Sequence, residues 1–255
     1  MLLAVDIGNT EIGLGLWEGG WRARFRVRTV VGKTPDEYDV LLRALLFRDG
    51  VDPGCLSRAV VGSVVPPLTQ VFRELLGGWL GREPLLVGPG VRTGLPLRVD
   101  HPSEVGADLV AGAVAAQAKL GAPCIVVDFG TATTFACVDR EGALRGGAIA
   151  PGLAASAEAL KERTALLPEV PLEAPPQALG RNTRQAMQSG LIFGYVGLVR
   201  ELLRRLRAEL GQAPVIATGG LAGLIAPLVE EIEEVDPWLV LDGLRLIADR
   251  NLPSP

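Results

Sequence analysis

The stretch of sequence best suited to chemistry is Cys124–Phe135, which reads CIVVDFGTATTF. The β-branched residues Ile125–Val127 predict a strand buried on both faces, and Asp128 ends it. Gly130 lets the backbone turn sharply, and threonines at 131, 133 and 134 supply hydroxyls there. Backbone N–H groups and hydroxyls can face a phosphate while the carboxylate faces its counter-cation. The alternative interpretation is an ordinary β-turn, in which Asp, Gly and Thr are also common.

The same pattern occurs at the start of the chain. The apolar run Leu2–Val5 leads into Asp6–Thr10, which reads DIGNT. Another strand-like run follows each copy, at Ile12–Trp17 in the first and Phe135–Val138 in the second. Two hairpins of a phosphate-binding type in one chain predict two related domains that face one nucleotide.

A third acid, Asp108, is expected in the first two turns of a helix that starts near Ser103, a candidate cap, and runs towards Leu120. The N-terminal end of a helix favours the ionised form of a carboxylate, so Asp108 could take up a proton if it faces a cleft. The competing interpretation is a solvent-facing acid in the first turns of a helix, which is common.

A further glycine-rich turn follows the apolar run Pro214–Ala217, where the chain reads Thr218-Gly219-Gly220. Two glycines at a strand end would let a planar base or a ribose lie against the backbone. A plain strand-to-helix turn is the alternative.

One apparent phosphate motif fails on inspection. Gly32-Lys33-Thr34 imitates the end of a Walker A loop, but that motif needs a glycine at position 27, where the chain has Val27. Thr34 is better explained as a helix N-cap, because Pro35 occupies the first helical position and Glu37 completes a capping box.

Composition narrows the class of protein. The 255 residues are 48% hydrophobic and 21% charged, which is typical of a globular chain. The net charge of −4 argues against a nucleic-acid partner, and no apolar run is long enough to span a membrane. The cysteines, Cys55, Cys124 and Cys137, are odd in number and lack metal-ligand spacing, which favours reduced, buried thiols and a cytoplasmic location.

The two hairpins organise the remaining elements. Each half begins with a strand meander and then alternates strands with helices, which predicts two α/β domains with a nucleotide cleft between them. We place the domains at residues 1–102 and 103–255. A long helix is expected to reach about Leu210, with Thr183 as its cap. In this arrangement Asp6 and Asp128 fit the cation side of a phosphoryl transfer and Asp108 fits the base.

Seven segments in order also carry a resemblance to a known family. They are Asp6–Thr10, Ser63–Pro66, Gly88–Val91, Pro102–Asp108, Asp128–Thr134, Gly146–Gly152 and Thr218–Gly220. The series resembles the motifs of type III pantothenate kinases and runs from residue 2 to residue 251. The hairpin motifs alone are shared with the wider acetate kinase–sugar kinase–Hsp70–actin superfamily, whereas the whole series is specific to the family. The resemblance implies two ribonuclease H-like, actin-like ATPase domains.

The resemblance implies that ATP phosphorylates the primary hydroxyl of pantothenate to 4'-phosphopantothenate, the first step towards coenzyme A. With the glycine turn, the implied ATP site comprises Asp6, Gly8, Asn9, Thr10, Gly13, Thr131, Gly219 and Gly220. The implied pantothenate site comprises Gly106, Ala107, Asp108, Leu109 and Thr183, with Asp108 as proton acceptor. Asp128 would bind a monovalent cation, K⁺ or NH₄⁺, and Mg²⁺ would accompany ATP beside Asp6. Thr183 would reach pantothenate from the neighbouring subunit, which implies a homodimer.

Two positions depart from the family pattern. The family usually carries Arg directly after the catalytic Asp, where this chain has Leu109, and Glu11 stands where Asn is frequent. Leucine cannot pair with the carboxylate of pantothenate, so another cation such as Arg92 substitutes, pantothenate binds weakly, or the acceptor differs. The rival functions are therefore a non-catalytic regulator on the same scaffold and a kinase for another small hydroxyl acceptor.

Overall fold

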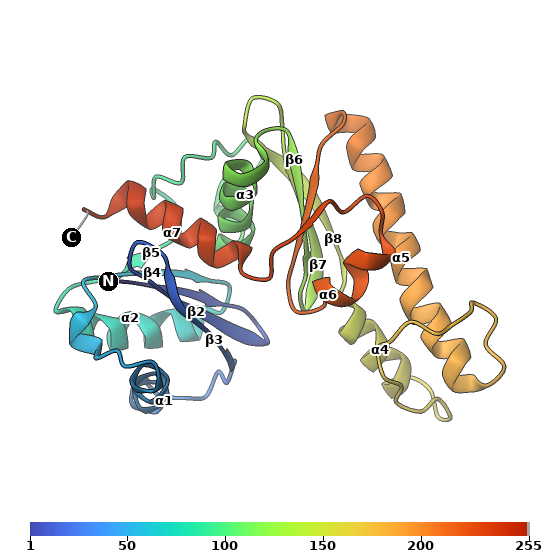
Figure 1. The fold of residues 1–255 in the computed structure, drawn as a ribbon, viewed down its shortest axis with the longest axis horizontal. Helices are drawn as coiled ribbons and strands as arrows, with labels where there is room; N and C mark the ends of the chain where they lie inside the picture. Colours follow the sequence, from blue (N-terminus) through green and yellow to red (C-terminus); the bar gives the residue numbers. More distant parts are fainter. Residues whose placement is uncertain (254–255) are drawn as a thin grey trace. The chain divides into compact units, whose positions relative to one another are not determined.

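The computed structural model of the protein describes residues 1–253. The chain forms two compact units (Figure 1). The first unit contains Met1–Ala115 and the segment from Leu239 onward, and the second contains Ala116–Trp238. The predicted division at residue 102 stays a prediction.

Each unit is built on one five-stranded sheet of the same design. The first sheet has the order β3-β2-β1-β4-β5 and the second the order β10-β9-β6-β7-β8. In both, three consecutive strands form an antiparallel meander, and two later strands join parallel to the first strand of that meander. The predicted mixed α/β fold with a meander at the start of each half is therefore confirmed. The strands are β1 (Leu2–Ile7), β2 (Glu11–Trp17), β3 (Trp21–Arg28), β4 (Arg58–Ser63), β5 (Leu85–Leu86), β6 (Cys124–Phe129), β7 (Ala132–Val138), β8 (Leu144–Pro151), β9 (Val215–Thr218) and β10 (Glu234–Val235).

In the first unit, helices cover both faces of the sheet. Helices α1 (Pro35–Arg48) and α2 (Pro66–Leu80) enclose an apolar core with one face. Helix α7 (Leu239–Asn251) packs along β1, β2 and β4 on the other face, and α3 (Ala107–Leu120) begins beside it (Figure 1). The capping box predicted at Thr34 is present and starts α1.

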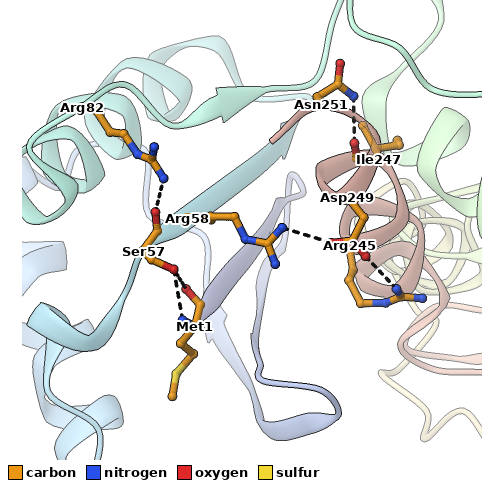
Figure 2. A network of polar contacts seen from close by, with 8 residues as sticks. All are labelled: Met1, Ser57, Arg58, Arg82, Arg245, Ile247, Asp249 and Asn251. Atoms are coloured by element: carbon orange, nitrogen blue, oxygen red, sulfur yellow. Dashed lines mark hydrogen bonds and ion pairs between the residues drawn. The ribbon is translucent and has the colours of Figure 1, made fainter. Parts of the chain in front are cut away.

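Helix α7 runs antiparallel to β4 and is held along its length. Near its start Leu241 lies beside Gly13 of β2, and near its end Asp249 accepts a hydrogen bond from Arg58, the first residue of β4 (Nη1–Oδ1 3.2 Å). Figure 2 shows this end of the helix, where Asp249 also pairs with Arg245 at 3.0 Å. The side chain of Arg58 is only 8% exposed, so this ion pair fastens the helix to the interior of the unit.

In the second unit, α4 (Leu153–Glu162), α5 (Thr183–Leu210) and α6 (Ala222–Ile225) pack with the face of the sheet that carries Ile125, Val127 and Phe129. Helix α5 is capped one residue earlier than predicted. The side chain of Asn182 accepts a hydrogen bond from the backbone of Gln185, and Thr183 is the first helical residue.

Three short 3₁₀ turns, η1 (Pro53–Cys55), η2 (Pro102–Glu104) and η3 (Ala226–Leu228), connect these elements. Ser103, predicted as a helix cap, lies inside η2, and α3 starts only at Ala107 because the chain is extended at Val105 between them.

Of the three cysteine thiols predicted to be buried, two are buried. Burial in the second sheet raises the pKa of Cys124 and of Cys137 to about 12, whereas Cys55 is exposed. No helix within residues 1–253 has the length and apolar character needed to cross a membrane.

Candidate active site

The first candidate acid, Asp6, lies one residue before the end of β1 between two glycines. The register pairs it with Gly13 on β2 and with Gly62 on β4. A Cβ atom built at Gly13 would lie 3.7 Å from the Cβ of Asp6, so the two positions share one face of the sheet. Neither cross-strand neighbour carries a side chain, and the nearest atoms over these two glycines belong to Leu241, Leu244 and Ala107.

The turn after Asp6 is held by hydrogen bonds that leave its tip exposed. The backbone N–H of Gly8 donates to Glu11 (3.0 Å), and Thr29 after β3 donates its hydroxyl to the carbonyl of Gly8 (2.7 Å). The backbone N–H of Thr29 also donates to Thr10 (2.9 Å). Asn9 and Thr10 are exposed, as expected for residues that would contact a nucleotide.

The second candidate, Asp108, lies in the first turn of α3 and is partly buried. Its Oδ1 accepts a hydrogen bond from the backbone N–H of Leu109 at 2.7 Å. A Cβ atom at Gly106 would lie 2.4 Å from the same oxygen, so only glycine leaves room for this carboxylate. Burial raises the pKa of Asp108 above its usual range, against the lowering effect of the backbone hydrogen bond. A raised pKa is what a carboxylate needs to accept a proton near neutral pH.

The fold brings the start of α3 to the edge of the sheet where Asp6 lies. Gly62, which pairs with Asp6, has Ala107 as a neighbour: a Cβ built on it would lie 3.7 Å from the Cβ of Ala107. Val64 follows β4, donates its N–H to the carbonyl of Ile7 (3.0 Å), and lies against Gly106. Gly106–Leu109 therefore sits beside the end of β1, which joins the predicted phosphate and acceptor residues of the first unit.

The third acid, Asp128, occupies the equivalent strand position in the second unit. It pairs with Thr134 on β7 and with Thr218 on β9. Gly219 has a φ of +91°, and a Cβ atom there would lie 2.3 Å from Oδ1 of Asp128 and 2.6 Å from the carbonyl carbon of Phe129. Both the backbone angle and the space therefore require glycine at position 219, directly against the carboxylate of Asp128.

Three other predicted residues of the second unit are on its surface. Thr131 is exposed beside the turn in which Gly130 donates its N–H to Ala132 (3.1 Å), and Gly220 is exposed after Gly219. Thr183 lies outside this group, exposed in the first turn of α5.

A buried polar contact near Asp128 was not predicted from the sequence. The hydroxyls of Thr133 and Tyr195 form a short hydrogen bond between β7 and α5. Burial raises the pKa of Tyr195, and the charge of Asp128 raises it further. The two residues are 62 positions apart, so no local pattern reports their contact.

Arg92, suggested as a substitute for the missing arginine, has its backbone held at the end of α7. Asn251, the last residue of α7, accepts a hydrogen bond from the N–H of Arg92 (3.1 Å) and donates one to its carbonyl (2.8 Å). The role of Arg92 as a substitute cation stays a prediction.

Each hairpin offers one acid, Asp6 or Asp128, as a possible cation ligand. Mg²⁺ keeps several waters and can be held by one or two carboxylates together with substrate phosphates. Within residues 1–253, no three His, Cys, Asp or Glu side chains gather into a metal cluster.

Solved structures with the same fold define the class of protein. The chain resembles the activator of the 2-hydroxyisocaproyl-CoA dehydratase from Clostridium difficile, a structure with bound ADPNP (TM-score 0.55, 12% identity, 100% of this chain and 98% of that one). It also resembles the inorganic polyphosphate/ATP-glucomannokinase from Arthrobacter sp. strain KM (TM-score 0.50, 18% identity, 98% and 99%). The fold is that of the actin-like ATPases and sugar kinases.

Sequence comparison then identifies the family within this class. Residues 2–205 match the family model of the type III pantothenate kinases. A type III pantothenate kinase from Thermomicrobium roseum is 52% identical over 252 residues, which cover 98% of this chain and 97% of that protein. The chain therefore belongs to the type III pantothenate kinase family, and it is a kinase. Nothing in the comparisons favours the regulator or a different acceptor.

Proposed function

We propose that the chain transfers the γ-phosphoryl group of ATP to the primary hydroxyl of pantothenate, with Asp108 as proton acceptor. Membership of the type III pantothenate kinase family supports the reaction, and the surroundings of Asp108 support its assignment as the proton acceptor. The acid is partly buried, its pKa is raised, and it lies beside the strand end that holds Asp6.

Asp108 would remove one proton from the acceptor hydroxyl. As the pantothenate oxygen bonds to the γ-phosphorus and the bond to the β–γ bridging oxygen breaks, the hydroxyl proton passes to the carboxylate, and ADP leaves. The Leu109 N–H keeps one carboxylate oxygen, Oδ1, fixed, so the other would be available to the acceptor. Gly106 leaves the space that Oδ1 occupies in this position.

The two hairpins are proposed to serve the same ATP in different ways. The exposed turn at Gly8, Asn9 and Thr10, with Gly13 behind it, would contact phosphates, while Asp6 would hold Mg²⁺ through water. Asp128 would hold the monovalent cation, K⁺ or NH₄⁺. Bound cations would offset the charge that develops on the transferred group.

The remaining assignments concern the outer parts of the ligands. Thr131 and the Gly219-Gly220 turn would contact ATP, because the turn exposes backbone beside Asp128. Ala107 and Leu109 would line the pantothenate site, and Thr183 of a second copy would complete it in a homodimer. Thr183 is exposed at a helix start, which is compatible with contact across a subunit boundary. We place this reaction in the cytoplasm.

The test is ADP release by the wild type and by Asp108→Asn, with ATP and Mg²⁺, with and without pantothenate and potassium. We expect pantothenate-dependent turnover in the wild type and a loss of at least about 10³-fold in the variant, since the general base is removed while the side-chain shape is kept. Asp36→Asn is the matched control, because Asp36 is also an acid in a first helical turn but is exposed. Wild-type turnover without pantothenate dependence, or full activity of Asp108→Asn, would contradict the proposal.

A further inference from the structure

Helix α3, which carries Asp108, touches helix α7 at a point where α7 has no side chain. That point is Gly243. A Cβ atom built there would lie 1.8 Å from the carbonyl oxygen of Ala111, 2.4 Å from its carbonyl carbon and 2.9 Å from its Cα. All three atoms are backbone, so no change of side-chain rotamer relieves the overlap. One of the two helices has to move if position 243 carries any side chain.

Helix α7 is the less able of the two to move, because long-range contacts fasten it to the sheet on both sides of Gly243. Asp242 accepts a hydrogen bond from the indole N–H of Trp21 (2.6 Å), and the guanidinium of Arg245 lies 4.5 Å from the ring centre of Trp17. Towards the helix end, Asp249 pairs with the buried Arg58 (Figure 2).

The next residue of α7, Leu244, prevents α7 from moving towards the sheet. Leu244 packs into the space left by Gly62, where even a Cβ atom would lie 2.9 Å from its methyl group. Moving α7 towards the sheet would press this side chain into β4. The displacement caused by a side chain at position 243 therefore falls on α3.

Helix α3 transmits such a displacement directly to the candidate base. Ala111 is three residues after Asp108, so the two lie on adjacent turns of the same helix face. The buried side chains of this helix are short, with Ala111, Ala113, Ala115 and Ala116 beside Val110 and Val114, so few rotamer changes are available to absorb a shift. A movement at Ala111 moves the carboxylate with it.

We infer that Gly243 is a positioning residue for the phosphoryl transfer, because it sets how closely α3 packs and hence where Asp108 lies relative to the end of β1. This inference rests on the role proposed for Asp108. Nothing about Gly243 requires contact with ATP or pantothenate; it acts through the backbone of Ala111.

The first test is Gly243→Ala, compared with Gly78→Ala in helix α2 of the same unit. Both replace a helical glycine, but a Cβ atom at Gly78 meets nothing within 4 Å. Helix propensity alone favours alanine by about 1 kcal/mol at either position. We expect Gly78→Ala to keep wild-type kcat and Gly243→Ala to lose about 10- to 100-fold in kcat, since a misplacement near 1 Å can cost about 10². KM for ATP should stay within about threefold, because the variant leaves the Asp6 turn intact.

The second test separates positioning from general damage. Asp108→Glu lengthens the acid by one methylene, and it should lower kcat less in the Gly243→Ala background than in the wild type. The acid limb of the pH profile of kcat/KM should also move to lower pH in Gly243→Ala, because a displaced carboxylate is less buried. Additive kinetic effects together with an unchanged pH profile would overturn the inference.

The variants distinguish a failure of the base assignment of Asp108 from a failure of the positioning role of Gly243. If Asp108→Asn is inactive and folded Gly243→Ala keeps full kcat, the positioning role is wrong and the base assignment stands. If Asp108→Asn is fully active, both are wrong. Should Gly243→Ala fail to fold, Trp21→Phe releases α7 without adding an atom at the crossing. It should lower kcat by about 3- to 10-fold at unchanged KM for ATP, and an unchanged kcat would overturn the inference.

Discussion

The hairpins at Asp6 and at Asp128 occupy the same strand position in two sheets of the same topology, yet their immediate neighbours differ. Asp6 is flanked across the sheet by Gly13 and Gly62, whereas Asp128 is flanked by Thr134 and Thr218. One scaffold has thus placed one acid between two glycines and the other between two threonines. Threonine hydroxyls can add oxygen ligands to a cation, whereas glycines leave those ligands to water or a substrate phosphate.

The second difference lies in the residue that follows the neighbouring parallel strand. In the second unit, Gly219 has a left-handed backbone and lies directly against the carboxylate of Asp128. In the first unit, β4 ends at Ser63, and the close glycine is Gly62, whose nearest neighbour is a methyl group of Leu244. The glycine beside Asp6 is therefore covered by helices α3 and α7, whereas the carboxylate of Asp128 is covered by the turn that follows β9.

Replacing Asp6 and Asp128 in turn tests the difference between the two hairpins with the largest expected effect on activity. Asp6→Asn and Asp128→Asn should each lower kcat/KM by about 10²- to 10³-fold, because each removes a carboxylate proposed to hold a cation that offsets charge on the transferring group. Only Asp128→Asn should abolish activation by potassium, whereas Asp6→Asn should raise the Mg²⁺ concentration needed for half-maximal rate. Rates measured over potassium and magnesium series check this, and equal potassium activation of the two variants would contradict it.

The two close glycines provide a test of intermediate size. Gly219→Ala should cost about 1–3 kcal/mol of stability, since its φ of +91° and its contacts with Asp128 and the backbone both become unfavourable. Gly62→Ala should cost less than about 1 kcal/mol, because its obstacle is the far end of the flexible side chain of Leu244. Urea unfolding of both variants measures the difference. A larger loss for Gly62→Ala would show that α7 constrains the first hairpin more tightly than the turn constrains the second.

The smallest expected effect concerns the stability of the first unit against pH. Because the folded pKa of Asp108 is raised, its ionised form destabilises the folded state at neutral pH, and this penalty fades as pH falls through the folded pKa to the ordinary value. Asp108→Asn should therefore raise Tm at pH 7 while abolishing activity, and the gain should vanish at acid pH, where both states are protonated. Thermal melts of both proteins across pH check this sign. A Tm gain that grows towards acid pH would contradict it.

Much of this site could be predicted from sequence because its signals are local. A buried apolar run that ends in Asp and Gly identified both hairpins, and the capping box at Thr34 was complete within four residues. The helix cap before α5 was misplaced by one residue, since Asn182 and Thr183 are adjacent and both have suitable side chains.

The rest depends on contacts between distant segments, which no local pattern reports. No motif in the sequence singles out Gly62 or Gly243. Their importance appears only when α7 is packed between α3 and the sheet. The backbone of Arg92 is likewise fixed by hydrogen bonds to Asn251, 159 positions further along the chain.

The division of the first unit into two segments has a consequence for synthesis on the ribosome. Helix α7, which is made after the second unit, covers the face of a sheet whose strand β1 is made before it. During translation that apolar face stays uncovered by α7 until all of the second unit has been produced. The second unit is continuous in sequence and can fold as soon as Trp238 has emerged, so the usual N-terminal-first order of domain folding is reversed here. A nascent chain stalled before Leu239 should hold a folded second unit and an unfinished first one.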